Sequence, residues 1–599
     1  MLLKLSLTGI KSRFKDYLIL LSGLIMASAI FYMFEALATN QEFIKQNATI
    51  KFAAMIFQVG SVLLAIITLF YIIYANTFLM SMRQRDYGMF MMLGAKKRKI
   101  GRLIFTETLI IGLIATAVGI LVGIGLTYGV SQFLVDKMDL APHSFQAFYF
   151  PAILITMLFF VILFMIAAIF NRQSLLRTPI LKLLNEAEQP QGKKLKSYNI
   201  LIQSILGLGL IASGYYLLSH LALFQMAGFI GSVVTILIGT FLIFNSLFSG
   251  LVQLLKRNKG FSEKQLNTFL LGQLSFRLGS LNRVLTMVAM LFALALGAIT
   301  VGMGFSGVVD QTATSTSPYD VVVQNPSTKE KKLLSQLTGK KESVYEAKKV
   351  GSVRYFKKSD FVKSPLYTLD FTETGTATGK FIKVDPVKMT AKNEDNLWGN
   401  AVRTTLESPD MLDPVLVSDS SFTAVSAKTQ RIYTVRLASF KDNKEILKAL
   451  SEEIPKNQLD NSSYFMNKYV VYQLANGIYG GLEFIGFFLG VAMLAMLASV
   501  LMFKILSSAA TDKKRYDLLN QLGAKQRLMK KSIRREIGIL FFLPGVVGVI
   551  HVLFGLQMFK ELIPDPYTHI TIPFIIFAVL YLGYYWVTVT LYKGIVLKK

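Results

Sequence analysis

Apolar runs of membrane-spanning length alternate with short polar segments along most of the 599-residue chain. A helix needs roughly 20 apolar residues to cross the hydrocarbon core of a bilayer, and several runs here reach that length. We therefore predict ten membrane-spanning helices. Their approximate bounds are 17–37, 52–80, 104–133, 150–170, 200–218, 226–255, 284–309, 482–506, 537–556 and 572–591.

One stretch, 310–478, lacks this pattern. Its apolar runs shorten, and Lys, Asp, Ser and Thr dominate. We predict an α+β domain that is long enough to have its own core. Its predicted strands are 319–323, 352–356, 366–371, 380–384 and 431–437, and its predicted helices are 327–337 and 443–453.

The N-terminal residues 1–16 place Leu3, Leu7, Ile10 and Phe14 at helical spacing, with basic residues between them. This pattern is typical of a helix that lies in the headgroup layer, and a basic tail that only orients the protein is the alternative. Before the seventh span, Leu-Ser-Phe at 274–276 weakly echoes Leu-Ser-Leu at 5–7.

The predicted fold class is an α-helical polytopic membrane protein, with ten transmembrane helices in two similar halves and one α+β domain between spans seven and eight. The predicted domains are an interfacial helix at 1–16, a four-helix half at 17–185, a linker with spans five and six at 186–255, an amphipathic helix with span seven at 256–309, the α+β domain at 310–478, and spans eight to ten at 479–599.

The composition and charge agree with a membrane protein, since 53% of residues are hydrophobic and the mean hydropathy is +0.49. The net charge is +28, but residues 310–478 are nearly balanced, with 24 Lys and Arg against 20 Asp and Glu. The excess lies in short segments between spans, which indicates the positive-inside rule rather than a nucleic-acid surface. The basic clusters fall at both termini and after spans two, four, six and eight. This alternation predicts cytoplasmic termini and an extracellular 310–478 domain.

Enzymatic chemistry finds little support in the sequence. The absence of cysteine excludes disulfides and thiol catalysis. The chain has no Gly-x-x-x-x-Gly-Lys-Ser/Thr, no His-Glu-x-x-His and no Gly-x-Ser-x-Gly. We expect no catalytic residue, no metal site and no cofactor bound by this chain.

The connection between spans two and three is repeated between spans eight and nine. We call residues 83–107 the first connector and residues 512–536 the second connector; they match at a constant offset of 429 residues. The matched positions are Tyr87, Leu93, Gly94, Ala95, Lys96, Arg98 and Glu107 in the first, and Tyr516, Leu522, Gly523, Ala524, Lys525, Arg527 and Glu536 in the second, while Arg85 meets Lys514. The glycine permits a tight turn between a short helix and the next span. One copy would suit an amphipathic elbow at the bilayer surface, whereas two copies favour docking on a two-fold partner.

Three carboxylates, Glu35, Glu107 and Glu536, fall in or at the ends of predicted spans. An ionisable group at such a depth is a candidate functional site. Pairing of Glu107 and Glu536 with connector Lys or Arg, which would fix the bend, is the favoured interpretation over ion coupling.

The connector motif resembles the segment between two spans of FtsX/MacB-type permease domains, which is the coupling helix that docks on an ABC ATPase. The ten-span layout, with one large domain between spans seven and eight, is similar more narrowly to Bce-type permeases. Those are Firmicute transporters for resistance to bacitracin, lantibiotics and similar peptides. The resemblance implies two FtsX-like halves with coupling segments at 83–102 and 507–535. The implied ATPase-docking residues are Arg83, Arg85, Tyr87, Leu93, Gly94, Ala95, Lys96, Lys514, Arg515, Tyr516, Leu522, Gly523, Ala524 and Lys525.

The resemblance also implies the partners. They are two copies of an ABC ATPase that carry ATP and Mg, often a sensor histidine kinase, and a peptide antibiotic or lipid pyrophosphate at the membrane of a Gram-positive cell. Asp517 and Leu518 replace Gly88 and Met89 of the first connector, so the two docking sites are not expected to be identical. Two other functions use the same connector: transmission of force to a cell-wall hydrolase or sensor kinase, and extraction of lipids or lipoproteins.

Overall fold

The computed structural model describes residues 14–40, 50–138, 146–177, 197–264, 266–371, 377–384, 401–402, 405–406, 412–453, 467–560, 562–563, 565–568 and 570–597. Most of the predicted interfacial helix at 1–16 and most of the linker after residue 185 lie outside these ranges. The chain divides into two compact units: Ser306–Gly480, and Met1–Phe305 together with Gly481–Lys599. We describe each unit separately.

The ten predicted spans are confirmed as ten helices that are long and apolar enough to cross a membrane. Several continue well beyond the apolar run, because the flanking polar residues extend the same helix. The helices are α2 Phe14–Thr39, α4 Ile50–Met92, α5 Lys97–Met138, α6 Phe150–Arg177, α8 Ser197–Ser219, α9 Leu221–Asn245 with α10 Leu247–Arg257, α12 Asn267–Thr316, α19 Gly481–Gln521, α20 Gln526–Gly555 and α21 Thr571–Val596.

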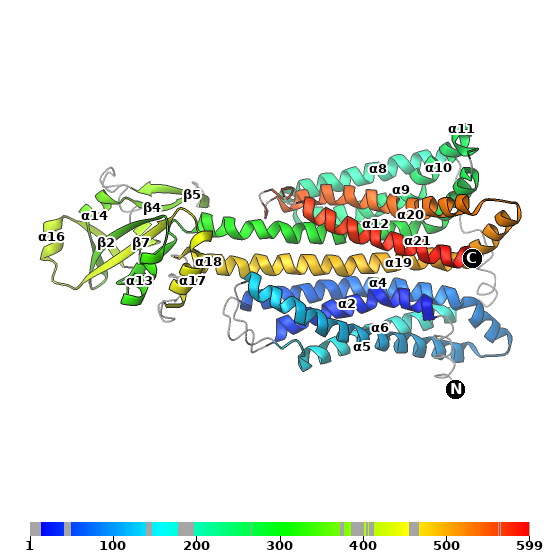
Figure 1. Ribbon diagram of the computed structural model, residues 1–599, viewed down its shortest axis with the longest axis horizontal. Coiled ribbons are helices and arrows are strands. Elements are labelled where there is room, and N and C mark those ends of the chain that lie inside the picture. The colour runs from blue at the N-terminus through cyan, green and yellow to red at the C-terminus, as the bar shows by residue number, and fades with distance from the viewer. Residues whose placement is uncertain are drawn as a thin grey trace. The chain divides into compact units, whose positions relative to one another are not determined.

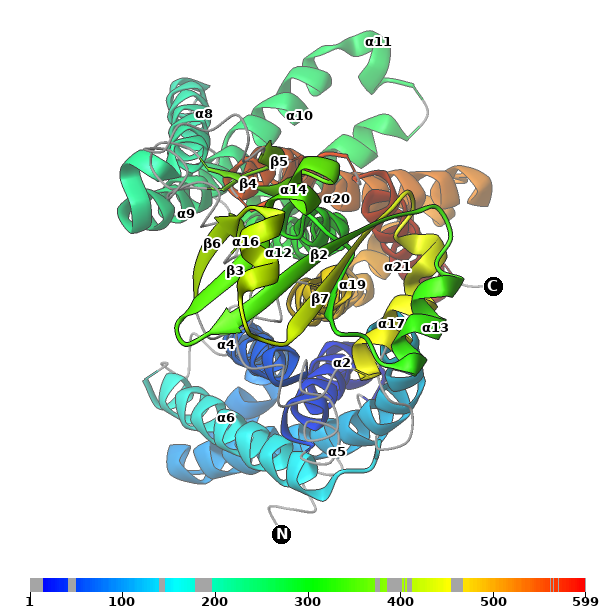
Figure 2. The ribbon, with the colours of Figure 1, turned by 90° about the vertical axis from the view of Figure 1, so that its left-hand side faces the viewer.

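Helix α19 is central to the helical unit, because it packs against α2 and α4 on one side and against α21 on another. Figures 1 and 2 show α2, α4, α5 and α6 grouped on one side of α19, with α12, α20 and α21 on the other. Helices α8 and α9 form a hairpin that packs beside α20. The short helix α11, Lys259–Ser262, follows α10.

Two pairs of glycines spaced four residues apart, Gly119 with Gly123 and Gly486 with Gly490, bring helices into close contact. A Cβ atom added at Gly119 of α5 would lie 2.9 Å from the carbonyl oxygen of Ile25 on α2. One added at Gly486 of α19 would lie 2.7 Å from the Cα of Gly302 on α12. No larger side chain fits at either position without moving a helix backbone.

The second unit contains a five-stranded sheet in the order β1-β7-β2-β3-β6 and a separate β4-β5 hairpin. Among the strands that the structure describes, only the β3-β6 pair is parallel. The strands are β1 Val321–Gln324, β2 Lys340–Val350, β3 Val353–Lys357, β4 Leu366–Phe371, β5 Ala377–Val384, β6 Asp413–Val417 and β7 Thr429–Leu437. The helices are α13 Thr328–Gln336, α14 Lys358–Lys363, α16 Asp419–Ala424, α17 Lys444–Glu453 and α18 Lys468–Ala475, with a 3-10 turn at Lys441–Asn443 and a π-helical segment at Asn476–Gly480.

Alternation along the strands gives this sheet two buried faces. Val321 and Val323 pack with Leu334 of α13 and Leu447 of α17. The side chain between them in sequence, Val322, faces the opposite cluster, which includes residues of β2, β3, β4 and α14. Figure 2 shows α13 and α17 side by side, in agreement with their contacts.

The five predicted strands each overlap an observed strand, as the two predicted helices overlap α13 and α17. The prediction missed β2 and β6; in β2, the longer of the two, Lys and Glu fill most positions. One of these, Lys348, is buried, and its ammonium group donates to the carbonyl oxygens of Phe422 and Val425 at 2.9 Å. A lysine with its charge satisfied by carbonyls can occupy a core position that sequence patterns assign to solvent.

Candidate functional site

The two connectors fold alike, but not into the short separate helix that the sequence suggested. Helix α4 continues without a break to Met92, and α19 continues to Gln521. The turn then occupies residues 93–96 in the first connector and 522–525 in the second, before α5 and α20 begin. Each connector is therefore a sharp elbow between two long helices, so a displacement of the turn acts directly on both.

Main-chain hydrogen bonds define the same turn in both copies. Gly94 has φ +94° and Gly523 has φ +82°, a left-handed conformation that favours glycine. The Gly94 amide donates to the Met91 carbonyl, and the Ala95 amide donates to the Phe90 carbonyl at 2.9 Å. In the second copy, Gly523 donates to Asn520 and Ala524 to Leu519, both at 3.0 Å. This is the Schellman helix ending, and it explains why Leu-Gly-Ala is repeated.

The tip of each turn exposes a leucine. Leu93 is 85% exposed and Leu522 is 84% exposed. Each follows other exposed apolar side chains, Met92 in the first connector and Leu518 in the second, and precedes an exposed lysine. Exposed apolar side chains on a polar loop are a common mark of a protein-binding surface, particularly when the arrangement occurs twice.

A buried cluster holds the first elbow together; we call Arg83, Tyr87 and Glu107 the first clasp. Arg83 forms an ion pair with Glu107 through Nη1 and Oε1. The Tyr87 hydroxyl donates to Oε2 of Glu107 at 3.2 Å, and the Arg83 guanidinium lies 5.1 Å from the centre of the Tyr87 ring. All three side chains are buried. Through these three side chains, the clasp joins the end of α4 to the start of α5.

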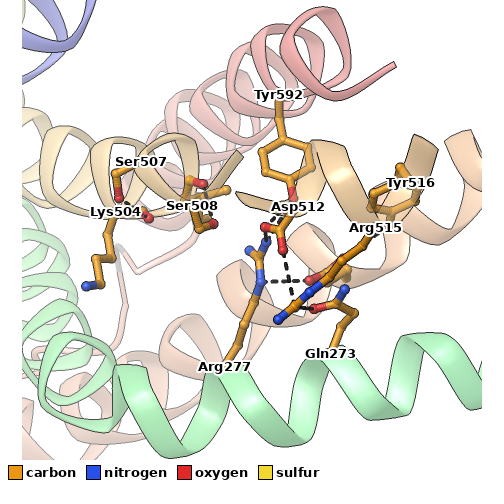
Figure 3. Close-up of polar contacts among 11 residues, drawn as sticks. Gln273, Arg277, Lys504, Ser507, Ser508, Asp512, Arg515, Tyr516 and Tyr592 are labelled. Atoms are coloured by element: carbon orange, nitrogen blue, oxygen red, sulfur yellow. Dashed lines mark hydrogen bonds and ion pairs between the residues drawn. The ribbon is translucent and has the colours of Figure 1, made fainter. Parts of the chain in front are cut away.

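The second elbow has a larger cluster from four helices; we call Arg277, Asp512, Tyr516, Glu536 and Tyr592 the second clasp. Figure 3 labels all of these residues except Glu536. Arg277 of α12 donates from Nη2 to Asp512 of α19 at 2.5 Å, and its Nε lies 2.8 Å from Oε1 of Glu536 on α20. The same Nη2 donates to the hydroxyl of Tyr592 on α21 at 2.8 Å, and that hydroxyl donates to Asp512 at 2.9 Å.

A partly exposed arginine extends the second clasp. Arg515 donates to Gln273 of α12 at 2.8 Å and lies 3.4 Å from Asp512. Tyr516, the counterpart of Tyr87, donates to Glu536 at 3.5 Å. Burial raises the pKa of Tyr516 above its usual value, so its hydroxyl keeps the proton that it donates.

Arg277 also keeps its positive charge in the second clasp. Burial by itself lowers the pKa of Arg277, but the neighbouring Glu536, Tyr592 and Asp512 raise it above its usual value. A buried ion pair is costly to break when one partner is removed, because the other charge is left without compensation. Each clasp thus contains a buried ion pair that can fix the angle of its elbow.

The structure separates the predicted docking residues into two groups. Arg83, Tyr87 and Tyr516 are buried and point into the clasps, so they hold the elbow and offer no surface to a partner. The outward group comprises Leu93, Gly94, Lys96, Lys514, Leu522, Gly523 and Lys525, with Ala95, Arg515 and Ala524 half-buried. The side chain of Arg85 lies outside the described part of the chain.

The third predicted carboxylate, Glu35, belongs to neither clasp. It is buried in α2, three residues after Tyr32, whose hydroxyl donates to the Ala147 carbonyl and accepts from the Tyr149 amide. A Cβ atom added at Gly123 of α5 would lie 3.0 Å from the Tyr32 ring, so Glu35 lies beside α5 about four helical turns away from Glu107. No shared role with Glu107 and Glu536 follows from its position.

Sequence reasoning missed Arg277, Asp512 and Tyr592. One signal was present: at the offset of 429 residues, Arg83 meets Asp512, an inverted charge. Because of that inversion, the second connector lacks the arginine that would pair with Glu536. The cation therefore had to come from another part of the chain, such as a basic residue just before another span.

Comparisons with known proteins agree with this architecture. Residues 58–180, which include the whole first connector, match the FtsX-like permease C-terminal family. Residues 58–180 thus form an FtsX-like permease domain, and the relatives described below support a permease subunit of an ABC transporter. More narrowly, the chain is homologous to Bce-type bacitracin export permeases along most of its length.

Three relatives from two organisms illustrate the homology. The chain is 25% identical to the bacitracin export permease protein BceB of Bacillus subtilis, over 92% of this chain and 93% of the relative. It is 25% identical to the ABC transporter permease protein YxdM of the same organism, over 82% of each chain. It is 23% identical to BceB of Halalkalibacterium halodurans, over 92% of each.

Proposed function

We propose that this protein is the permease subunit of a Bce-type ABC transporter that gives resistance to, and senses, peptide antibiotics that bind cell-wall lipid intermediates. Two copies of a separate ATPase, which carry ATP and Mg, dock on the exposed tips of the two connectors. Closure of the ATPase pair then moves both elbows. The twin turns with equally exposed leucines are the observation that carries this proposal.

The clasps support the mechanical part of the proposal. A docked motor transmits force only if the docking tip cannot rotate independently of the helices behind it. Arg83, Glu107 and Tyr87 bind α4 to α5, and the second clasp binds α19 to α12, α20 and α21. Movement at each tip therefore passes to the helices of its half.

The peptide and the other partners are proposed by analogy. Relatives named as bacitracin export permeases support a peptide antibiotic as ligand, bound alone or with a lipid pyrophosphate. We also propose cytoplasmic termini and connectors, a Gram-positive host and a sensor histidine kinase partner. In this arrangement, 310–478 lies outside the cell and meets the peptide.

The docking step can be tested with aspartate at the two tips. Leu93→Asp with Leu522→Asp should abolish co-purification of the cognate ATPase and peptide-stimulated ATP hydrolysis, because two exposed apolar contacts become charged. Val362→Asp in α14 is the control, since Val362 is also exposed but lies in the other unit. Wild-type co-purification of the double variant would refute docking at the tips.

The physiological role needs a separate experiment. Deletion of the gene should lower the inhibitory concentration of bacitracin-like or lantibiotic peptides, and re-expression of the wild type, but not of the double aspartate variant, should restore it. If deletion leaves the whole peptide panel unchanged while the ATPase still docks, the peptide role is wrong and force transmission to another envelope protein is favoured.

A further inference from the structure

An apolar groove of about 480 Å³ lies among α12, α20 and α21. Its walls include Phe292 of α12, Phe541, Gly545 and Val549 of α20, and Phe577 and Tyr581 of α21. Along α20 the lining runs from Gly538 to Ile550, which corresponds to about 18 Å of helix. That length is close to the roughly 15 Å of hydrocarbon in one leaflet.

The groove opens toward the lipid phase. Phe542 and Leu582 line it and are 67% and 61% exposed, and both belong to membrane-spanning helices. Water has no favourable place in such a site, because it would find almost no hydrogen-bonding partners. A hydrocarbon chain is the occupant that both the lining and the surroundings favour.

Three cations gather beyond the connector-side end of the groove. Arg534 and Lys530 lie one and two turns before Gly538 on α20, along the same face. Tyr585 closes this end, since its hydroxyl donates to the Arg534 carbonyl at 3.1 Å. Lys593 of α21 lies near Arg534 and Lys530, whose positive charges act on it. Among the described residues, none of these three cations has an acidic partner within ion-pair distance.

The first half has no equivalent combination at the matching positions. At the 429-residue offset, Gly112 takes the place of Phe541, and the ring of Phe164 on α6 packs directly against it. Phe105 takes the place of Arg534, and Gly101 takes the place of Lys530. Groove and cations thus occur together in the second half, which indicates one site rather than a general property of the fold.

We propose that this site binds an anionic glycerophospholipid from the leaflet on the connector side. One acyl chain fills the groove, and the headgroup phosphate lies against Lys530, Arg534 and Lys593. Burial of the chain supplies affinity, and the cations supply selectivity for an anionic over a zwitterionic headgroup. The inference does not depend on the ATPase or on the peptide.

The natural fluorophore Trp586 provides the test, since it follows Tyr585 on α21 and is 68% exposed. The chain has two tryptophans, so Trp398→Phe leaves Trp586 as the sole reporter. The full chain is placed in nanodiscs of phosphatidylcholine with increasing phosphatidylglycerol that is brominated near the headgroup end of its chains. Brominated phosphatidylcholine is the parallel probe.

The proposal expects quenching of Trp586 at lower mole fractions of the brominated phosphatidylglycerol than of the phosphatidylcholine. Arg534→Gln should reduce this preference about five-fold, and the triple glutamine variant at Lys530, Arg534 and Lys593 should abolish it. Gly545→Leu, whose side chain enters the groove, should weaken quenching by both lipids.

The matched control is a second triple variant in which Arg98, Lys99 and Arg102 are replaced by glutamine. These are also three exposed cations, but they lie at the start of α5 in the first half. This control should leave the preference unchanged. Equal quenching by the two lipids in the parent, or retained preference in the triple variant, would show annular lipid only and overturn the proposal. If Gly545→Leu does not fold, the surface glutamine variants still decide the result.

Discussion

In the first connector, Glu107 finds its cation 24 residues earlier, on the helix just before the turn. In the second, Arg277 reaches Asp512 across 235 residues of chain and pairs with Glu536 as well. Both clasps use an arginine, a glutamate and a tyrosine ring near the guanidinium, at 5.1 Å for Tyr87 and 5.6 Å for Tyr592. Among the contacts described, those of the first clasp join two neighbouring helices, whereas those of the second join four.

The difference arises at two positions. Residue 83 is arginine, and its counterpart 512 is aspartate. When the weakly similar segments 5–7 and 274–276 are aligned, the next position pairs Arg277 with Thr8, which lies outside the described residues. The second half thus has its cation on α12 and a carboxylate where the first half has its cation. A shared turn geometry therefore does not require shared side-chain partners, and the two elbows are expected to differ in stiffness.

The largest effect should come from removing each arginine. Arg277→Thr leaves Asp512 and Glu536 buried with only the partly exposed Arg515 nearby, so we expect a loss of about 3–5 kcal/mol. Arg83→Thr removes this cation from one buried carboxylate, Glu107, and from the half-buried Asp86, so the loss should be smaller. Thermal unfolding of the purified permease in detergent measures both, and equal midpoints for the two variants would contradict the comparison.

A transplant controls for non-specific damage. Asp512→Arg in the Arg277→Thr background recreates the first-half arrangement, with one arginine and one glutamate, and should recover most of the lost stability. Asp512→Asn in the same background removes a carboxylate without adding a cation, and should recover less. If the Arg277→Thr/Asp512→Arg variant is no more stable than the Arg277→Thr/Asp512→Asn variant, an arginine at position 512 cannot replace Arg277, and the two clasps are not interchangeable.

A smaller effect should separate the two tyrosines. Tyr87→Phe removes a 3.2 Å hydrogen bond to Glu107, which should cost about 1.5 kcal/mol because the acceptor is charged. Tyr516→Phe removes a weaker 3.5 Å bond to a glutamate that Arg277 already holds, so its cost should be lower. The same unfolding measurement tests this order. A larger loss of stability for Tyr516→Phe would mean that Arg277 does not compensate the charge of Glu536.

The smallest loss of stability should come from replacing the glycine of each turn, and it should be the same in both halves. Gly94→Ala and Gly523→Ala force an L-residue into a left-handed conformation, at about 1 kcal/mol each, and an added Cβ meets nothing within 4 Å. Gly125→Ala in α5 is the control, because that position is helical and also open, so no loss is expected. Unequal losses at the two turns would show that the turns differ in more than their side chains.

The fold was predictable where a local pattern determines it. Hydropathy predicted all ten spans, because an apolar run of sufficient length is enough to mark a membrane helix. The Leu-Gly-Ala repeat gave both turns, because a Schellman ending depends on a few consecutive residues. The prediction of a separate short helix was wrong, because no residue in Arg83–Met92 interrupts the helix that precedes it.

The candidate site was only half predictable for the same reason. Glu107 and Tyr87 lie within one connector, and their shared spacing with Glu536 and Tyr516 pointed to them. Arg277 and Tyr592 come from helices that only the tertiary fold brings to the second turn. Strand β2 was missed because burial of Lys348 depends on two carbonyls from another element, which no periodicity reports.

The second clasp has a consequence for the order in which its residues can be exchanged. An ancestor with threonine at position 277 and arginine at position 512 would need two replacements to reach the present Arg277 and Asp512. If aspartate comes first, two buried carboxylates face each other with no guanidinium between them. If arginine at position 277 comes first, two guanidiniums share Glu536 and Tyr592 until one is exchanged. Lineages or laboratory selections that cross between the arrangements should therefore pass through the two-arginine form.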